Sequence, residues 1–424
     1  MTKTIFPKQA LRGTIRVPGD KSISHRAVMF GAIADGTTDI TGFLDGEDCR
    51  ATIACFRQLG VNITQNGTHV SVEGKGLHGL SAPVSKLDVG NSGTTIRLMS
   101  GILAAQNFKT QMTGDAMIQR RPMDRVITPL TQMGADIQGV NGGFAPLRIK
   151  GSRLRGIHYD MPVASAQVKS AILLASLYAD GVTTIKEPFP SRDHTERMLN
   201  GFGADIRAIN GVIESQPIQK LSAAPIEIPG DISSAAFFII AALIIPDSHI
   251  IIENVNVNQT RAGLLDALRQ MGADIRLLNP QLICGEEVAN LEVFSSKLQG
   301  IEIGGAMIPR MIDEIPILSV AAMFAEGITT IRDARELKIK ESNRIRVMAE
   351  ELKKLGGIIH ETDDGMIISG GQRLHGGATD SRGDHRIAMS MAIAGLCAAD
   401  SVEILGAECA NVSFPDFYDL LDSL

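Results

Sequence analysis

Basic residues stand at or just after the starts of several predicted helices, where their charge needs an explanation. They are Lys21 and Arg26 in DKSISHR (20–26), Arg97 in GNSGTTIR (90–97) and Arg386 in GDHRIAM (383–389). The positive end of a helix repels a cation by about 0.3–1 kcal/mol, so capping does not account for these residues. Helix N-termini and basic side chains together suit phosphates and carboxylates. The pattern predicts that several helix starts converge on an anion-binding site, with a solvated surface as the alternative.

Small polar residues at the same helix starts have a simpler interpretation. Ser92, Ser233 and Asp384 belong to the residue types that cap helices, each cap contributing about 1 kcal/mol. The stretch VPGDKSISHR (17–26) is only partly like a nucleotide-binding loop, because that loop needs Gly directly before its Lys and Asp20 stands there. Taken alone, the stretch favours a solvated turn over a nucleotide site.

Two further basic pairs support the anion site. Arg120 and Arg121 stand at a predicted junction between a loop and a helix, which is a weak signal by itself. Lys340 and Arg344 are four residues apart and are predicted on one face of a helix. Like charges at that spacing cost roughly 0.2–0.5 kcal/mol unless an anion lies between them. Since Glu341 lies between them in the sequence, a salt-bridged surface helix is the alternative.

Two acidic residues are candidates for proton transfer. Asp313, in MIDEIPILSV, opens an otherwise apolar predicted helix and could be only its cap, and the second candidate is Glu341. A reaction that removes one proton and delivers another needs two such groups in different electrostatic settings. The histidines do not cluster with spaced acids or cysteines, so no metal site is expected.

A repeated unit must position these residues. Five segments of the type LTQMGADI predict a helix that ends on Gly, with a strand directly after it. Their glycines are Gly60, Gly134, Gly203, Gly272 and Gly356, at intervals of 69 to 84 residues. An apolar helix and a Gly-Thr strand start precede most of them, and a sixth copy opens at residue 383 and runs to the C-terminus. We therefore predict six units of helix, strand, helix and strand, divided three and three.

The interior of each half is predicted to consist of helices. SAAFFIIAALII (234–245) and AIAGLCAA (392–399) are apolar nearly all round, which places them inside, beneath sheets. Two similar junctions, VPGDKSIS and IPGDISSA, mark crossings of the chain between the halves. The predicted domains are residues 20–230 and residues 1–19 plus 231–424, with a hinge near 18–21 and 229–231.

Composition limits the class of protein. The chain has 424 residues, a net charge of −6, no Trp and three Tyr, which argues against a nucleic-acid binder. Five cysteines without a CxxC pair favour buried, reduced thiols. No signal peptide is recognised, and the longest apolar run, residues 235–245, is too short to span a membrane. We expect a cytoplasmic protein.

The motifs resemble those of the 5-enolpyruvylshikimate-3-phosphate synthase family, in the family's order, from about Ile15 to Phe417. The matching stretches are PGDKSISHR, GNSGTTIRL, RRPM, PVASAQVKSAILLA, LKIKESNRI and GDHRIAMS. The resemblance implies a two-domain inside-out α/β barrel of six βαβαββ-type units, with the active site in the cleft between the domains. It also implies transfer of the enolpyruvyl group of phosphoenolpyruvate to the 5-hydroxyl of shikimate-3-phosphate, on the route to chorismate. No cofactor or metal, a monomer, and no nucleic-acid or membrane partner are expected.

The resemblance also implies a role for each site residue. Those expected to bind shikimate-3-phosphate are Lys21, Ser22, Arg26, Ser165, Gln167, Ser191, Asp313 and Lys340. Those expected to bind phosphoenolpyruvate are Lys21, Gly93, Arg121, Gln167, Arg344 and Arg386, the last two holding its carboxylate as paired guanidinium groups do. Asp313 is expected to accept the proton of the 5-hydroxyl, and Glu341 to exchange a proton with the methylene carbon. Lys21 completes the expected catalytic set.

Three positions depart from part of the family. Ala166 stands where many members have a second Ser, Glu336 where some have Asn, and Val412 where some have a Lys that binds phosphate. These features are similar to the family's second class, which includes glyphosate-tolerant members, whereas Gly93 is the small residue associated with sensitivity.

Two other functions are weighed against this one. The UDP-N-acetylglucosamine 1-carboxyvinyltransferase family shares the fold and the donor, but it has a Cys in the loop that corresponds to residues 113–121, where this sequence has none. A non-catalytic repeat protein that binds a phosphorylated ligand would explain the repeats, but not Asp313 and Glu341 beside the basic residues.

Overall fold

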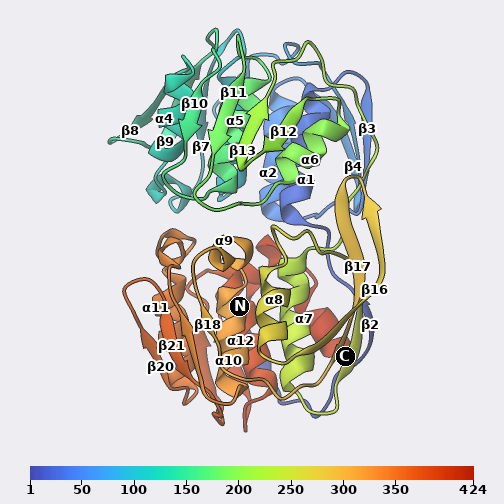
Figure 1. Cartoon of the computed structure of the whole chain (residues 1–424), viewed down its shortest axis with the longest axis vertical. Coiled ribbons are helices and arrows are strands. Elements are labelled where there is room, and N and C mark those ends of the chain that lie inside the picture. The colour runs from blue at the N-terminus through green and yellow to red at the C-terminus, as the bar shows by residue number, and fades with distance from the viewer. The chain divides into compact units, whose positions relative to one another are not determined.

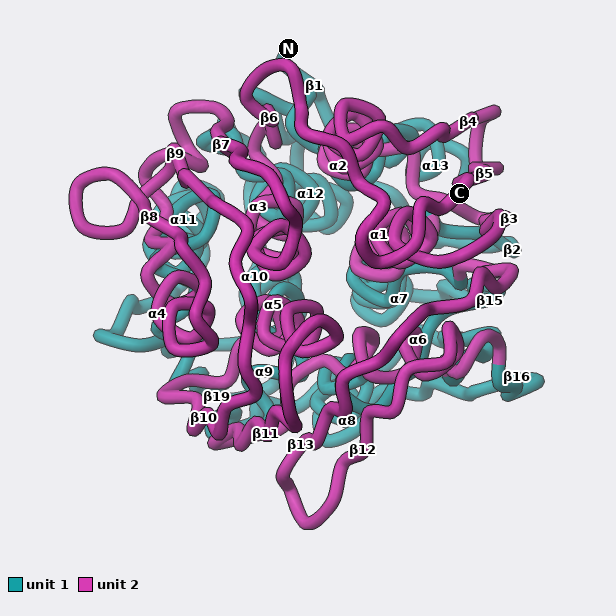
Figure 2. Tube along the Cα trace, turned by 90° about the horizontal axis from the view of Figure 1, so that it is seen from above, with its two compact units in different colours: residues 1–18, 229–282, 287–424 teal, residues 19–228, 283–286 magenta.

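Two units divide the chain. The computed structural model describes residues 1–424. Unit 1 comprises Met1–Pro18, Pro229–Leu282 and Glu287–Leu424, and unit 2 comprises Gly19–Ile228 and Ile283–Glu286 (Figure 2). The predicted boundary at 20–230 lies within two residues of this division. Residues 283–286, which the prediction assigned to the other domain, group with unit 2 instead.

Unit 2 contains three four-stranded sheets, each belonging to one repeat. The first repeat consists of β14 (Ile226–Glu227), α1 (Lys21–Ile33), β3 (Thr37–Thr41), α2 (Glu47–Gln58), β4 (Asn62–Asn66) and β5 (His69–Glu73). The second consists of β6 (Leu87–Asp88), α3 (Gly93–Leu103), β7 (Lys109–Thr113), η1 (Ile118–Arg120), α4 (Asp124–Gln132), β8 (Asp136–Val140) and β9 (Phe144–Lys150). The third consists of β10 (His158–Asp160), α5 (Ala166–Ser176), β11 (Thr183–Lys186), α6 (His194–Gly201), β12 (Ile206–Ile209) and β13 (Val212–Ser215).

Unit 1 also contains three repeats (Figure 1). The two strands nearest the N-terminus, β1 (Thr2–Ile5) and β2 (Arg12–Arg16), each belong to one of its three sheets. One repeat contains β2 (Arg12–Arg16), α7 (Ile232–Ile244), β15 (His249–Asn256), α8 (Gly263–Gln270), β16 (Asp274–Ile283) and β17 (Glu286–Phe294). The next contains β18 (Glu302–Ile303), α9 (Met307–Met311), α10 (Ile315–Phe324), β19 (Ile328–Ile331), η2 (Arg335–Ile339), α11 (Arg344–Lys354), β20 (Ile359–Glu361) and β21 (Met366–Ser369). The last contains β22 (Gly377–Asp380), α12 (His385–Leu396), β23 (Val402–Leu405), η3 (Ala407–Val412), α13 (Phe417–Ser423) and β1 (Thr2–Ile5).

The order of strands in the five four-stranded sheets confirms the predicted βαβαββ unit, whereas the sixth sheet has only the strands β1, β23 and β22 and no closing hairpin. In unit 2 the first strand of each repeat pairs parallel with the second. In the second and third repeats an interior helix connects these two strands, as α5 connects β10 and β11. The last two strands form an antiparallel hairpin, as β12 and β13 do. The five repeat glycines all have left-handed backbones with φ between +88° and +100°, which ends each helix before its hairpin.

The apolar helices form the core of each unit, as predicted. Every residue of α7 from Ile232 to Leu243 is buried, because its Ala, Ile and Phe side chains leave no continuous polar face. Helices α7, α10 and α12 contact one another in unit 1, and α3 contacts both α1 and α5 in unit 2. Close approach at the interface of α3 with α5 depends on Gly101, where a Cβ would lie 2.2 Å from the carbonyl oxygen of Ala171.

The two ends of the 19–228 segment meet. A Cβ on Gly19 would lie 1.9 Å from the carbonyl oxygen of Gly42, and one on Gly42 would lie 2.5 Å from that of Ile228. In unit 1 the N–H of Asp231 donates to the carbonyl oxygen of Pro18 at 2.9 Å. In each unit, the backbone segments at which the chain enters and leaves therefore lie next to one another.

Several local expectations were wrong. Asp313 does not open a helix, because α10 begins at Ile315 after Glu314. Lys340 and Arg344 do not share a helix, since α11 begins at Arg344 and Asn343 caps it. The cap of α7 is Asp231 rather than Ser233, whereas Ser92 and Asp384 are caps as expected.

Two other expectations concerned buried, reduced thiols and the lack of a membrane-spanning segment. All five cysteines are free, but only Cys49 and Cys55 are buried, whereas Cys397 and Cys409 are half-buried and Cys284 is exposed. No helix combines the length and the apolar character that crossing a membrane requires.

Candidate active site

The start of α1 in unit 2 presents a lysine that is held by an acid. The Oδ1 atom of Asp20 accepts the N–H of Ile23 at 2.9 Å, which fixes the first turn of the helix. Lys21, the first residue of α1, forms an ion pair with Asp48 of α2, and both side chains are mostly buried. The ammonium is therefore fixed at the helix start, where it opposes the helix dipole.

Arg26 lies one turn further along α1 and joins three helices. Its Nε donates to Thr195 Oγ1 of α6 at 2.7 Å, and its Nη2 donates to Ser170 Oγ of α5 at 2.8 Å. Its Nη1 donates to the carbonyl oxygen of Ser22 at 2.9 Å, which keeps Ser22 and Arg26 together. Burial, together with the nearby charge of Arg192, lowers the pKa of Arg26 to about 10, although Glu196 opposes this shift. The guanidinium thus stays charged near neutral pH in a fixed orientation.

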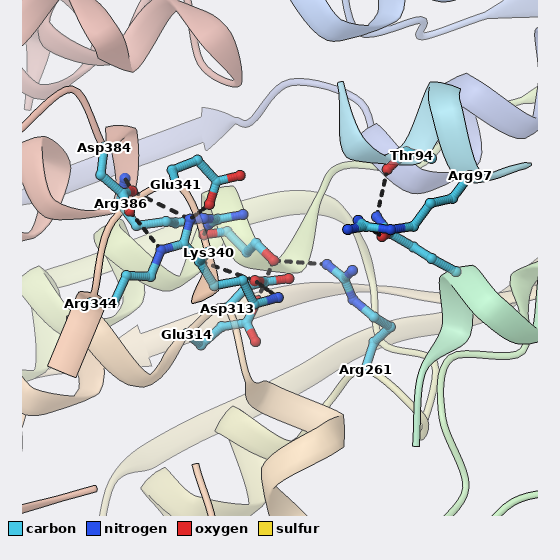
Figure 3. A network of polar contacts seen from close by, with 12 residues as sticks. Thr94, Arg97, Arg261, Asp313, Glu314, Lys340, Glu341, Arg344, Asp384 and Arg386 are labelled. Carbon is cyan, nitrogen blue, oxygen red and sulfur yellow. Dashed lines mark hydrogen bonds and ion pairs between the residues drawn. The ribbon is translucent and has the colours of Figure 1, made fainter. Parts of the chain in front are cut away.

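The start of α3 brings a glycine and two arginines together. A Cβ on Gly93 would lie 2.9 Å from Nη1 of Arg97 and 3.0 Å from Nη1 of Arg121, so both guanidinium groups reach the helix N-terminus. Arg97 also donates to Oε1 of Gln167 at 2.6 Å, and Gln167 donates to Thr94 Oγ1 at 3.0 Å (Figure 3). This grouping of N–H donors and positive charges suits a phosphate.

The start of α5 and the segment before α6 contribute two serines. Ser165 caps α5, and its Oγ accepts the N–H of Val168 at 3.4 Å. Ala166, the first residue of the helix, offers only its backbone. Ser191 is buried, and its hydroxyl donates to Oε1 of Glu187. Unit 2 thus collects the hydroxyl groups and cations that the sequence predicted for it.

In unit 1, Asp313 lies between α9 and α10 and faces two cations. Its Oδ1 lies 3.3 Å from Nζ of Lys340 and 3.1 Å from Nη1 of Arg344 (Figure 3). Lys340 and Glu341 belong to the segment between η2 and α11, so a loop rather than a helix positions them. The expected carboxylate and the two expected cations therefore lie together, although Lys340 and Arg344 do not share the helical face that was predicted for them.

Arg344 is the centre of this group. Its side chain is 2% exposed, its Nη2 lies 2.6 Å from Glu341 Oε2, and its Nε lies 2.9 Å from Asp384 Oδ2. Burial alone would lower the pKa of Arg344, but the carboxylates of Asp384, Glu341 and Asp313 outweigh burial and raise it. One permanent positive charge therefore organises three carboxylates.

Arg386 is the second residue of α12, and its guanidinium has a donor available. Its Nη1 donates to the carbonyl oxygen of Ser233 at 3.0 Å, and its guanidinium lies 5.8 Å from the centre of the Phe237 ring. Its Nε is buried and has no hydrogen-bond partner in the protein. An unsatisfied buried donor on a cation is suited to an anionic ligand.

A second buried arginine supports this region and was not predicted. Nη2 of Arg261 donates to Asp231 Oδ1 at 2.9 Å and to Ser233 Oγ at 2.8 Å, and the hydroxyl of Ser233 bonds Glu314 (Figure 3). Glu314 is the residue directly after Asp313, so the contact fixes the loop that carries Asp313.

The structure therefore assembles the predicted residues into two groups and adds others. Lys21, Ser22, Arg26, Gly93, Arg121, Ser165, Gln167 and Ser191 belong to unit 2, and Asp313, Lys340, Glu341, Arg344 and Arg386 belong to unit 1. The residues missed are those that hold them: Asp48, Arg97 as a partner of Gln167, Ser170, Thr195, Arg261, Glu314 and Asp384 as a partner of Arg344. Two of the positions that depart from the family, Glu336 in η2 and Val412 at the end of η3, are half-buried.

Comparisons with known proteins cover nearly the whole chain. A family model described as EPSP synthase (3-phosphoshikimate 1-carboxyvinyltransferase) matches residues 5–421. Curated relatives with the name 3-phosphoshikimate 1-carboxyvinyltransferase include one from Thermoanaerobacter sp. (strain X514), 57% identical over 417 residues, with 98% of each chain covered. Another, from Bacillus cytotoxicus, is 55% identical over 418 residues, covering 98% of this chain and 99% of the relative. Among solved structures, an EPSP synthase from Acinetobacter baumannii has a TM-score of 0.89 and 46% identity, covering 100% of this chain and 98% of the other.

Proposed function

The chain belongs to the EPSP synthase (3-phosphoshikimate 1-carboxyvinyltransferase) family, and from this membership we propose which residues carry out each step of the reaction. The reaction transfers the enolpyruvyl group of phosphoenolpyruvate to the 5-hydroxyl of shikimate-3-phosphate and releases phosphate, as part of aromatic amino acid biosynthesis. The observation that carries the assignment is the buried Arg344, which organises Asp313 and Glu341 on one cation.

Unit 2 is proposed to bind most of shikimate-3-phosphate. Arg26 and Ser22 hold the carboxylate and a neighbouring hydroxyl, and the fixed orientation of the guanidinium supports this role. Ser165 and Ser191 donate to the phosphate, while the backbone at Ala166 takes the place of a second hydroxyl. Orientation of this kind reduces the entropy that the reaction must lose.

The same unit is proposed to bind the phosphate of phosphoenolpyruvate. Gly93 allows the phosphate to approach the backbone at the N-terminus of α3, and Arg121 neutralises its charge. Gln167 and Lys21 contact both substrates. Arg97, which bonds Gln167, keeps that amide oriented.

Unit 1 is proposed to bind the carboxylate of phosphoenolpyruvate and to move protons. Arg386 and Arg344 hold the carboxylate, and the unsatisfied Nε of Arg386 supports this role. Because Arg344 already contacts three carboxylates, the substrate has to displace Asp313 or Glu341 from the guanidinium. The displaced carboxylate, Asp313 or Glu341, then becomes available for proton transfer beside the bound substrate.

The proton transfers follow from these positions. Asp313 accepts the proton of the 5-hydroxyl while the oxygen of that hydroxyl bonds to C2 of phosphoenolpyruvate. Glu341 delivers a proton to C3, and the product of this addition is a tetrahedral ketal phosphate. Phosphate then leaves, and C3 returns a proton to a carboxylate, which restores the vinyl ether. Lys340 lies beside Asp313 and stabilises the negative charge of its carboxylate.

Other expectations stay proposals. A monomer in the cytoplasm, with no nucleic-acid or membrane partner, agrees with the net charge of −6 and with the similarity to biosynthetic relatives. The hinge near residues 18–21 and 229–231 and the resemblance to the family's second class are supported only by the sequence.

One assay tests the proposed reaction against its rivals. Release of inorganic phosphate from phosphoenolpyruvate is measured with shikimate-3-phosphate and, separately, with UDP-N-acetylglucosamine. We expect release with the first acceptor only. Release with the second alone would assign the UDP-N-acetylglucosamine 1-carboxyvinyltransferase reaction, and binding of shikimate-3-phosphate without any release would favour the non-catalytic phospho-ligand-binding repeat protein.

A further inference from the structure

A lysine is buried within α5 just after the residues that start this helix. The side chain of Lys169 is 1% exposed, and every residue of α5 from Val168 to Ser176 is buried. Taking an ammonium group out of water costs several kcal/mol unless it is paired, so this position needs acidic partners. No step of the proposed reaction uses Lys169.

Two carboxylates pair with this lysine from the neighbouring segments. Nζ of Lys169 lies 3.0 Å from Oε2 of Glu187, which follows β11, and 2.8 Å from Oε1 of Glu196 in α6. Nζ also donates to the carbonyl oxygen of Ser191 at 3.2 Å. Burial lowers the pKa of Lys169, but Glu196 and Glu187 outweigh burial and raise it, so the lysine stays charged. One ammonium therefore connects α5, the segment 187–191 and α6.

Glu187 contacts Ser191 as well as Lys169. Its Oε1 accepts the hydroxyl of Ser191, and its Oε2 accepts the N–H of Ser191 at 3.2 Å. Pro188 and Pro190 lie between these two residues and restrict the backbone of the segment. The carboxylate thus fixes both the backbone and the hydroxyl of Ser191, while Lys169 fixes the carboxylate.

The arrangement has a consequence for a phosphate ligand. A serine hydroxyl has one proton to donate, and in Ser191 that proton is already engaged by a carboxylate. An unpaired carboxylate beside a phosphate would repel it, but the ion pair with Lys169 neutralises Glu187 locally. The hydroxyl of Ser191 can therefore redirect its hydrogen bond from Glu187 to the phosphate while its oxygen atom stays in place.

We propose that Glu187 is a positioning residue for shikimate-3-phosphate: anchored by buried Lys169, its carboxylate holds Ser191 where the hydroxyl can turn to the phosphate of the substrate. This inference rests on the proposed role of Ser191 in the site. Glu187 does not itself contact the substrate, so its effect is on the affinity for one substrate rather than on the chemical step.

A pair of matched substitutions separates this role from general support of the fold. Glu187→Asp keeps the charge and the partner of Lys169 but withdraws the carboxylate from Ser191 by one methylene. Glu196→Asp makes the same change to the other carboxylate on Lys169, which makes no hydrogen bond to Ser191. We expect Glu187→Asp to raise the KM for shikimate-3-phosphate by roughly 5- to 10-fold, the effect of losing one ordinary hydrogen bond, with little change in kcat or in the KM for phosphoenolpyruvate. Glu196→Asp is expected to leave all three constants near those of the unchanged protein.

The outcomes distinguish the inference from the function on which it rests. Ser191→Ala is measured in parallel, with direct binding of shikimate-3-phosphate as a second readout. If Ser191→Ala weakens binding and Glu187→Asp does not, or if both Asp variants behave alike, the inference is overturned and the site stands. If Ser191→Ala leaves binding unchanged, the proposed role of Ser191 fails and the inference fails with it. In the double variant, Glu187→Asp is expected to add nothing further to Ser191→Ala, because the effect acts through that hydroxyl.

Discussion

Nη1 of Arg344 and Oδ1 of Asp313 lie 3.1 Å apart, and this ion pair joins a buried guanidinium to a more accessible carboxylate. Arg344 is almost inaccessible, whereas Asp313 is 18% exposed at its side chain. The relationship therefore connects a fixed structural charge to a group that a substrate can reach. It makes separate predictions for stability and for turnover.

Replacing the arginine tests its structural contribution. Arg344→Ala leaves Asp384, whose side chain is 0% exposed, without its cation. We expect a loss of about 3–5 kcal/mol in the free energy of unfolding, measured by urea denaturation. The control is Arg346→Ala in the same helix, because Arg346 is exposed and pairs with Glu350 at the i,i+4 spacing. That exposed pair is expected to contribute little to stability, and equal losses in the two variants would contradict the central position of Arg344.

Replacing the acid tests its proposed role as a base. Asp313→Asn keeps the size of the side chain but cannot accept the proton of the hydroxyl. We expect kcat to fall by about 10²- to 10⁴-fold with much smaller changes in either KM, as measured from initial rates of phosphate release. Asp363→Asn removes an exposed acid of the same unit and serves as the control. A kcat for Asp313→Asn close to that of the control would assign the base elsewhere.

Replacing Arg26 tests the shikimate-3-phosphate half of the site. Arg26→Lys keeps the charge, but one ammonium nitrogen cannot take the places of the three guanidinium nitrogens that donate to Thr195, Ser170 and Ser22. We expect the KM for shikimate-3-phosphate to rise by roughly 10- to 100-fold, equivalent to one lost charge-assisted hydrogen bond of about 1.5–3 kcal/mol. The KM for phosphoenolpyruvate should change far less. A rise in the latter alone would reassign Arg26 to the other substrate.

A methyl group at Gly93 is expected to change binding without unfolding the protein. In Gly93→Ala the new Cβ meets the flexible ends of Arg97 and Arg121 at 2.9 and 3.0 Å, and these ends can move aside. Their displacement should raise the KM for phosphoenolpyruvate, while the free energy of unfolding changes by less than about 1 kcal/mol. Gly201→Ala, with nothing within 4 Å of its new Cβ, is the matched control for both measurements.

His25 predicts a dependence of stability on pH. Burial, with the positive charges of Lys21 and Arg26, lowers the pKa of His25 well below 6.5, so the folded protein keeps the imidazole neutral. Its Nδ1 lies 2.7 Å from Thr52 Oγ1. Below pH 6.5 the unfolded chain binds a proton that the folded chain does not, so stability falls as the pH falls. The contribution of this residue approaches about 1.4 kcal/mol per pH unit.

Thermal unfolding between about pH 7.5 and 5 checks this sign. His25→Asn retains a polar atom near Nδ1 and removes the titration, so its stability should vary less steeply with pH than that of the unchanged protein. His69→Asn, at an exposed position of the same unit, should leave the slope as it was. A steeper slope in His25→Asn would be inconsistent with a neutral imidazole in the folded state.

The sequence predicted the repeats because glycine and apolar periodicity are local signals. Each helix end at a repeat glycine follows from one residue that tolerates a left-handed backbone. Two of the wrong predictions concern helix starts, and local residues explain where these helices begin. Asn343, which accepts the N–H of Arg346, begins α11 too late to include Lys340, and Pro316 favours the start of α10 after Asp313 rather than at it.

The supporting residues could not be predicted in the same way. Lys169 pairs with an acid 18 residues away, and Arg261 bonds a serine 28 residues earlier in the chain. Neither spacing belongs to a helix or a strand, so only the assembled sheets and helices bring the partners together. Asp384 stands at a helix start that the sequence marks, but its ion pair with Arg344 joins residues 40 positions apart, and no local pattern indicates that pairing.

Nearly all of unit 2 is one continuous segment, residues 19–228, whose two ends meet at Gly19, Gly42 and Ile228. Since Asp231 already bonds the carbonyl of Pro18, we expect a short linker from Pro18 to Pro229 to close unit 1 when residues 19–228 are removed. The same proximity allows a circular permutant whose new termini lie at this crossing. The order of the six repeats along the chain is therefore separable from the packing of each set of three.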